Sequence, residues 1–346
     1  MNTVTAKLTE WAVEKIKREY AADVALLVAV DGHAVNADGH GECFDYYVPA
    51  TERGSKLAQT FIIDGIGYDL YPRTWERTER TATLDDSATS CLGNARILYS
   101  RSPEDEARFL AIRTRLFTNL GNGAFTYKKA LEKLNVAMDL YRTVMFEDEG
   151  YKVRMAVGYI HYYLALAVFY LNGTYRKEWQ GGWIPALLAL PALPEGFVET
   201  YQAIVRAKSA AELKSLAQQL IASARQFIAR YKPAEAAAVQ TPDFAELANW
   251  YQEISLWWRR LYYFCSIGDS DAAFAEAAQL QNEMTIVAAE FGISEMNLLG
   301  CFDADNLSAL QNRAAELEAT VIAEIEHHGV QLKRYNSLAE FLALNQ

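Results

Sequence analysis

Hydrophobic residues in the first hundred positions are grouped in a way that favours a small α/β unit. Residues 5–20 carry apolar side chains at helical spacing, and the continuous apolar run 24–30, VALLVAV, follows them. A short Val-rich run that ends at a glycine turn is typical of a buried strand. Between 51 and 62 the pattern is compatible with a short helix or a broad loop. Two further strands are predicted at 43–48 and 65–72, by short apolar segments bounded by Gly or Pro, and a fourth strand is predicted at 95–99.

After residue 101 the hydrophobic pattern changes to a helical period. Ser102 precedes Pro103 and two acidic residues, which is the composition of a capped helix N-terminus, and this helix is predicted to end near Leu120. Helical periodicity returns in the later segments, at 125–147, 150–171, 196–231, 242–266, 269–291 and 305–328. The sequence therefore predicts an α+β chain in which a small mixed sheet is followed by a large all-helical part.

Three domains are expected from these changes of pattern. Residues 1–103 are predicted to form the sheet domain, residues 104–235 a helical bundle, and residues 236–346 additional C-terminal helices packed on the bundle. A length of 346 residues suits two or three domains. The segment 233–244 has the composition of a loop or linker inside the helical part.

Charge and cysteine content argue against some classes of function. The formal net charge of -11 argues against a general nucleic-acid binder, whose surface is usually basic, but it permits a nucleotide that arrives with a divalent cation. The four cysteines form no CxxC pair, which argues against a zinc site or a disulfide framework. Free thiols favour a reducing compartment, so we expect a cytoplasmic protein.

One uncharged segment, residues 155–171, is apolar enough to be considered as a membrane-spanning helix. Spanning takes ~20 apolar residues, and this segment is shorter and contains His161 and several tyrosines. The charged, amphipathic stretch 1–20 also lacks the apolar core of a signal peptide. We therefore expect a buried helix of the bundle and no membrane partner.

The residues with the greatest chemical interest lie between positions 30 and 48, VDGHAVNADGHGECFDYYV. The turn Gly32-His33 follows the first predicted strand, and Asp45 lies in the second after eleven intervening residues. A glycine turn lets backbone N–H groups approach phosphates closely. Carboxylates at positions i and i+2 of a strand share one face, and a neighbouring strand can add a third. Three such carboxylates hold two Mg²⁺ ions ~4 Å apart, the arrangement that supports in-line phosphoryl displacement.

This order of helix, strand, Gly turn and two acidic strands resembles the nucleotidyltransferase fold of the polymerase-β-like superfamily, and in layout the aminoglycoside nucleotidyltransferases. The resemblance implies that Gly32 and His33 contact the phosphates of a nucleoside triphosphate. It also implies that Asp45 and Asp69 bind Mg²⁺. Asp69 would then accept the proton of the attacking hydroxyl on an unidentified small-molecule acceptor.

The resemblance extends, more weakly, to about residue 235. An apolar helix that ends in Leu171-Asn172, with Tyr175 and a basic residue after it, is similar to the helical domain of such enzymes. Two positions depart from the family pattern: His33 stands where the family has Ser, and Tyr47 stands where it has the second acid. A phenol is neutral near pH 7 and is a poor Mg²⁺ ligand, so the metal pair is incomplete.

Three functions follow from these observations. The first is transfer of a nucleotide from a nucleoside triphosphate to a hydroxyl acceptor. The second is a catalytically inactive relative of the same fold that binds a nucleotide or a partner and serves regulation or scaffolding. The third sets the resemblance aside and regards the chain as a helical interaction protein with a small α/β cap. If the second function holds, an acid restored by Tyr47→Asp would be expected to restore metal affinity.

Other notable residues have simpler interpretations. Arg154 and His161 match the R-x6-H motif of a family of helical ribonucleases, but a core histidine is the simpler reading of two residues on one helix face. His327 and His328 lie in a polar terminal helix and are expected at the surface. Aromatic residues between 250 and 264 favour core packing over a base-stacking wall, for which the neighbouring Arg259-Arg260 would be phosphate partners.

Overall fold

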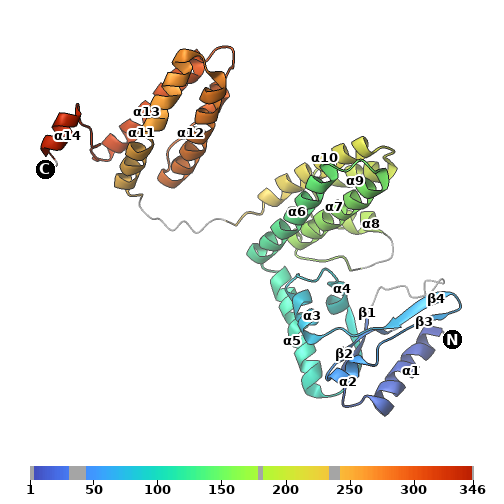
Figure 1. Ribbon diagram of the computed structural model, residues 1–346. Helices are drawn as coiled ribbons and strands as arrows, with labels where there is room; N and C mark the ends of the chain where they lie inside the picture. The colour runs from blue at the N-terminus through green and yellow to red at the C-terminus, as the bar shows by residue number, and fades with distance from the viewer. Residues whose placement is uncertain (1–3, 31–43, 178–181, 234–241, 345–346) are drawn as a thin grey trace. The chain divides into compact units, whose positions relative to one another are not determined.

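The computed structural model describes residues 4–30, 44–177, 182–233 and 242–344. The chain divides into two compact units, Met1–Glu235 and Ala236–Gln346 (Figure 1). In the described residues, all strands lie in the first hundred positions and helices make up the remainder, so the α+β class is confirmed. Among these residues no helix has both the length and the apolar character that crossing a bilayer requires.

A three-stranded antiparallel sheet and a separate hairpin form the beginning of the first unit. The sheet has the order β2-β1-β5, and β3 pairs with β4 in the hairpin. We call residues 4–100 the sheet region. Its elements are α1 (Val4–Glu19), β1 (Val24–Val30), β2 (Phe44–Pro49), α2 (Glu52–Ser55), β3 (Gln59–Ile63), β4 (Ile66–Leu70), α3 (Trp75–Ala82), α4 (Ser90–Gly93) and β5 (Ala95–Ser100).

The hairpin differs from the sequence prediction, which had only a short helix or broad loop over residues 51–62. The structure places the short α2 there and then the strand β3. Asp64 and Gly65 both have positive φ, 50° and 78°, at the turn between β3 and β4. An Asp-Gly pair in this conformation suits a two-residue hairpin turn, because its twist matches that of the flanking strands.

The chain beyond the hairpin joins the main sheet at Tyr47. The Tyr47 amide donates to the Tyr71 carbonyl at 3.1 Å, and the Arg73 amide donates to the Tyr47 carbonyl at 2.8 Å. The bridge between Tyr47 and Pro72 is parallel. The segment that leaves β4 therefore lies beside β2, which is how the two predicted acidic strands become neighbours.

The two faces of β2 contribute to different cores. Tyr46 and Val48 pack in a cluster that includes Phe109 and Tyr170 from the helices that follow the sheet region. Tyr47 packs on the other face, in the cluster formed with α1 and the hairpin. Alternation along the strand therefore separates a helix-covered face from an α1-covered face.

The helices that follow form the bundle region of the first unit. The Ser102 side chain accepts a hydrogen bond from the Asp105 amide at 3.2 Å, so the predicted cap at the first of these helices is confirmed. The single helix expected over 196–231 is two helices, because the chain leaves helical geometry at Ala207 and Ser209 caps the second. The elements are α5 (Pro103–Leu120), α6 (Gly123–Met145), α7 (Gly150–Leu171), α8 (Trp183–Leu188), α9 (Phe197–Arg206) and α10 (Ala210–Ala229).

The second unit has three long helices around its own hydrophobic core. The aromatic residues expected to be core are mostly so, with Trp258 fully buried and Tyr263 more than half exposed. A short final helix lies beyond the predicted ones. The elements are α11 (Phe244–Ile267), α12 (Ser270–Phe291), the 3-10 turn η1 (Leu299–Cys301), α13 (Ser308–His327) and α14 (Leu338–Leu344).

Candidate functional site

The predicted phosphate-binding residues, Gly32 and His33, lie outside the described residues. Asp45 lies in β2, and its backbone is described but its side chain is not. In the pairing of β1 with β2, Val28 is opposite Tyr46 and Ala29 is opposite Phe44, so the register shifts at Asp45. Such a bulge interrupts the alternation of side chains along a strand.

Asp69 is the fourth of the five residues of β4 and lies opposite Thr60 of β3. Its side chain is exposed, whereas its neighbours Tyr68 and Leu70 are buried in the cluster that contains Tyr47. Since side chains alternate along a strand, Asp69 points away from that cluster. The second predicted metal ligand is therefore on the solvent side of the hairpin.

Tyr47 is a core residue in the described structure. It has no exposed surface, and its hydroxyl donates to the Ser55 carbonyl at 3.1 Å. Burial raises the pKa of Tyr47 to about 12, so the phenol stays neutral. The position where the family pattern has its second acid thus points into an apolar cluster and away from Asp69.

The described residues do not fit a two-metal centre. Among them, no group of three or more His, Cys, Asp or Glu side chains is arranged to hold a metal ion. Asp69 and the buried Tyr47 face opposite sides, and an apolar environment disfavours a charged ligand at position 47. No step of a two-metal transfer can be built from this set.

The simpler interpretation of His161 is confirmed. The ring is 2% exposed and stacks on Tyr201, with centroids 3.6 Å apart, and Trp183 packs against its edge. Burial lowers the pKa of His161 to about 3, so the imidazole is neutral at physiological pH. Arg154 donates to the Ala207 carbonyl. These contacts give both residues of the R-x6-H match a packing role.

Arg259 and Arg260 of the second unit are held by carboxylates. Glu318, 7% exposed, accepts hydrogen bonds from the hydroxyls of Tyr251 and Tyr262, each at 2.8 Å, and from Arg259. Arg260 pairs with the buried Glu276 at 2.9 Å. The two arginines thus stabilise the helix packing of this unit, and phosphate binding would have to compete with these carboxylates.

A polar contact that the sequence patterns did not predict links the sheet region to the bundle region. The loop after α3 contributes Asp85 and Ser87, which bind Lys129 of α6 at 2.6 Å and Tyr162 of α7 at 2.8 Å. The Asn119 amide donates to the Ala82 carbonyl at 2.9 Å. We call this contact, between residues 82–94 and residues of α5 to α7 with the segment 172–177, the joint.

Tyr175 is the central residue of the joint's second half. Its hydroxyl donates to the Asn94 side chain at 2.7 Å, and the Asn94 amide donates to the Lys177 carbonyl at 2.6 Å. A Cβ added at Gly93 would lie 2.1 Å from the Tyr175 hydroxyl, so this close approach requires glycine. The Leu-Asn-x-x-Tyr run indicates a helical domain through the resemblance, but it does not predict this contact.

Two pockets lie at or beside the joint and share Tyr175. The smaller, about 30 Å³, is lined by hydroxyl groups of the loop and by Arg176. The larger, about 520 Å³, lies between the end of α7 and α8 and has Phe169, Thr174 and Lys177 in its walls. A volume of this size is within the range of small-molecule sites.

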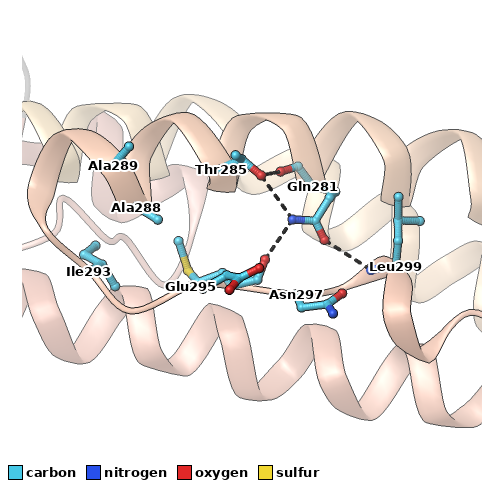
Figure 2. A pocket seen from close by; sticks show the side chains of 9 residues that line it. Gln281, Thr285, Ala288, Ala289, Ile293, Glu295, Asn297 and Leu299 are labelled. Carbon is cyan, nitrogen blue, oxygen red and sulfur yellow. Dashed lines mark hydrogen bonds between the residues drawn. The ribbon is translucent and has the colours of Figure 1, made fainter. Parts of the chain in front are cut away.

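A third pocket, also about 520 Å³, lies in the second unit between α12 and the segment that follows it (Figure 2). Gln281 holds its polar end: its amide nitrogen donates to the Met296 carbonyl at 2.8 Å, and its oxygen accepts from the Leu298 amide at 2.7 Å. Ala288 and Ile293 line the other end. The side-chain amide of Gln281 therefore binds the backbone of the segment that follows α12 and holds it against the helix.

Comparison with known proteins finds similarity only to solved structures. No family model and no curated protein matches the chain. A nucleotidyltransferase-like protein from Exiguobacterium sibiricum 255-15 is similar in its solved structure, with 13% identity, a TM-score of 0.34, and coverage of 64% of this chain and 74% of that chain. At this identity and TM-score, the similarity carries no assignment of activity.

Proposed function

We propose that this chain is a nucleotidyltransferase-like protein that binds a nucleoside triphosphate and has lost efficient nucleotidyl transfer. A regulatory or scaffolding role follows for a protein of that kind. The spacing of Gly32, Asp45 and Asp69 in the sequence supports nucleotide binding. Tyr47, in place of the second acid, supports the loss of nucleotidyl transfer.

The fully buried Tyr47 is the observation that carries the proposal. Two-metal catalysis needs a further anionic ligand beside Asp45, because Mg²⁺ demands near-ideal oxygen coordination, and the family pattern places that ligand two residues after Asp45. Tyr47 is buried in the cluster of α1 and the hairpin, and its hydroxyl is bonded to the Ser55 carbonyl. The side chain at position 47 therefore supplies neither charge nor a free oxygen to a metal.

The competing function is an active transferase that binds its metals through other acids. Asp38 and Glu42 lie between the Gly turn and β2 in the sequence, outside the described residues. An active enzyme would need one of them, with Asp45 and Asp69, to complete the set. Turnover separates the two functions directly.

The test is calorimetric titration of ATP in the presence of Mg²⁺, followed by an assay for pyrophosphate release with candidate hydroxyl acceptors. We expect saturable ATP binding and no pyrophosphate release above background. Robust release by the wild-type chain would overturn the loss of transfer, and absence of any ATP binding would overturn the nucleotide assignment.

Variants of the strand acids, compared with a matched surface variant, test whether the nucleotide binds at the strand acids. Asp45→Asn and Asp69→Asn should weaken Mg²⁺-dependent ATP binding, whereas Glu147→Gln, a change of the same kind at the surface of the bundle region, should not. Equal effects of all three would show that the strand acids form no common site. Small losses are expected for Asp69 because its side chain is exposed.

A further inference from the structure

The smaller pocket of the joint has walls from both regions of the first unit. The sheet region contributes a run of small hydroxyl residues, and the bundle region contributes two tyrosines and a guanidinium. Leu166 and Trp183 complete the lining with apolar surface. The polar lining residues are Ser87, Thr89, Ser90, Tyr162, Tyr175 and Arg176.

Arg176 is held in a defined position at this pocket. Its guanidinium carbon lies 4.3 Å from the centroid of the Trp183 ring, which is the geometry of a cation–π contact. Burial lowers the pKa of Arg176, but a guanidinium remains charged in proteins. The lining of the pocket therefore contains a partly desolvated cation that is oriented by an aromatic plane.

The hydroxyl of Ser87 has its own proton to donate. Tyr162 donates to Ser87 Oγ at 2.8 Å, so Ser87 acts as the acceptor in that bond. A serine hydroxyl has one donor and two acceptor sites, and accepting from Tyr162 leaves the donor for another oxygen. Ser87 and Arg176 are thus donors placed on opposite sides of the joint, one from each region.

The carboxylates next to this loop are already neutralised. Asp85 pairs with Lys129 at 2.6 Å, and Asp86 pairs with Arg77 at 2.8 Å and with Arg73 at 3.3 Å. These pairs lower the pKa of both aspartates, against the opposing effect of burial. Their negative charge is compensated locally by these cations.

The size of the pocket restricts the ligand. A single water molecule needs a cavity volume of roughly 10–15 Å³, and the volume of this pocket is about 30 Å³. That admits the oxygens of a compact head group and excludes a nucleobase or a sugar. Charge-assisted hydrogen bonds to an arginine are strongest for planar or tetrahedral oxyanions, for which the guanidinium fork is suited.

We propose that the joint pocket binds a phosphate group, either free or as the terminal group of a phosphorylated small molecule, through Arg176 and the hydroxyls of the 87–90 loop. Among the described residues that line this pocket, none is a strand acid of the proposed function. A bound phosphate would contact both regions at once and would stabilise the joint.

The test is isothermal titration of the full chain with inorganic phosphate and, separately, with AMP. Saturable binding of both identifies the shared head group, and binding of AMP alone would identify a phosphomonoester as the source. Arg176→Gln should weaken the binding about tenfold or more, since it removes a charge-assisted bond. Arg176→Lys should be intermediate, because it keeps the charge and loses the fork.

Two controls make the result specific. Arg142→Gln removes the same charge from an exposed arginine of the bundle region and should leave phosphate binding unchanged. Asp45→Asn combined with Asp69→Asn should also leave it unchanged, whatever these changes do to ATP binding. No phosphate or AMP binding at millimolar concentration, equal weakening by Arg142→Gln, or loss of phosphate binding in the strand-acid variant would each overturn the proposal.

Discussion

The two units of this chain differ sharply in charge. Residues 1–235 contain 28 acidic and 28 basic residues, whereas residues 236–346 contain 16 acidic and 5 basic ones. The whole net charge of -11 therefore belongs to the second unit. The unit that contains the candidate sites is balanced, so the charge of the complete chain says nothing about the ligand those sites prefer.

The units also differ in how they bury polar groups. In the first unit, polar side chains join the sheet region to the bundle region, as Ser87 and Tyr162 do across the joint. In the second, Glu318 and Glu276 bind arginines and tyrosines of neighbouring helices within one core. Polar contacts thus hold two regions together in the first unit and fix helix packing in the second.

The largest effect is expected at Tyr47. Tyr47→Asp places a carboxylate in the cluster of α1 and the hairpin, where no cation is paired with it, and removes the bond to Ser55. Burying an unpaired charge destabilises by about 3–5 kcal/mol. We therefore expect this variant to lose the fold of the sheet region instead of gaining metal affinity, which replaces the sequence-based expectation for the same change.

The measurement is hydrogen–deuterium exchange of the full chain, read separately for peptides of β1 and of α13. Exchange of β1 should rise strongly in Tyr47→Asp, while α13 should be unchanged. Tyr47→Phe is the matched control and should cost only about 1 kcal/mol, the value of one hydrogen bond. A folded Tyr47→Asp variant with new Mg²⁺ affinity would show that position 47 is open to a ligand after all.

The contrast at Tyr47 also shows what the sequence could and could not predict. The continuous apolar run 24–30 identified β1, a short and mostly apolar segment identified β5, and a capping pattern identified the start of α5, because these signals are local. The strand β3 was missed even though Asp64-Gly65 is a strong hairpin signal, because polar residues dominate the start of the 51–62 segment.

The candidate site depended on information that the sequence does not contain locally. The family pattern places Asp45 and position 47 on one face of β2 by strict alternation, whereas the pairing of β2 with β1 shifts its register at Asp45. The joint depends on a hydrogen bond between residues 75 positions apart, which no periodicity reveals. Tertiary approach decides such contacts, so the strand acids were predicted and the joint was not.

A smaller effect, confined to the second unit, is expected at Glu318. Glu318→Ala leaves the hydroxyls of the buried Tyr251 and the half-buried Tyr262, and the guanidinium of Arg259, without their acceptor. Buried groups that lose their partner cost about 2–3 kcal/mol in total. Exchange of α13 should therefore rise while β1 is unchanged, the reverse of the result at Tyr47.

Glu316→Ala is the control for Glu318. Its carboxylate is about two-thirds exposed and pairs only at the surface with Arg313, so a change within roughly 0.5 kcal/mol is expected. If Glu316 and Glu318 gave equal losses, the cause would be the charge of the helix and not the buried contacts.

The smallest effect concerns the joint, and it tests whether the first unit is held together by polar contacts. Tyr162→Phe and Ser87→Ala each remove the 2.8 Å hydrogen bond between α7 and the loop after α3. Each single change should lower the free energy of unfolding by about 1 kcal/mol, and the double variant should lose less than the sum, with a coupling of about 1 kcal/mol.

The measurement is denaturant unfolding of the wild type, the two single variants and the double variant. Hydrogen–deuterium exchange of β1 peptides in the same four proteins then shows whether the sheet region is affected. Effects of each substitution on its own segment, such as a change in helix propensity, cancel in the cycle. The coupling therefore reports only the interaction between Ser87 and Tyr162. Additive losses would show that the Ser87–Tyr162 hydrogen bond contributes no interaction energy. The joint would then be stabilised by its apolar residues, such as Leu166 and Tyr170.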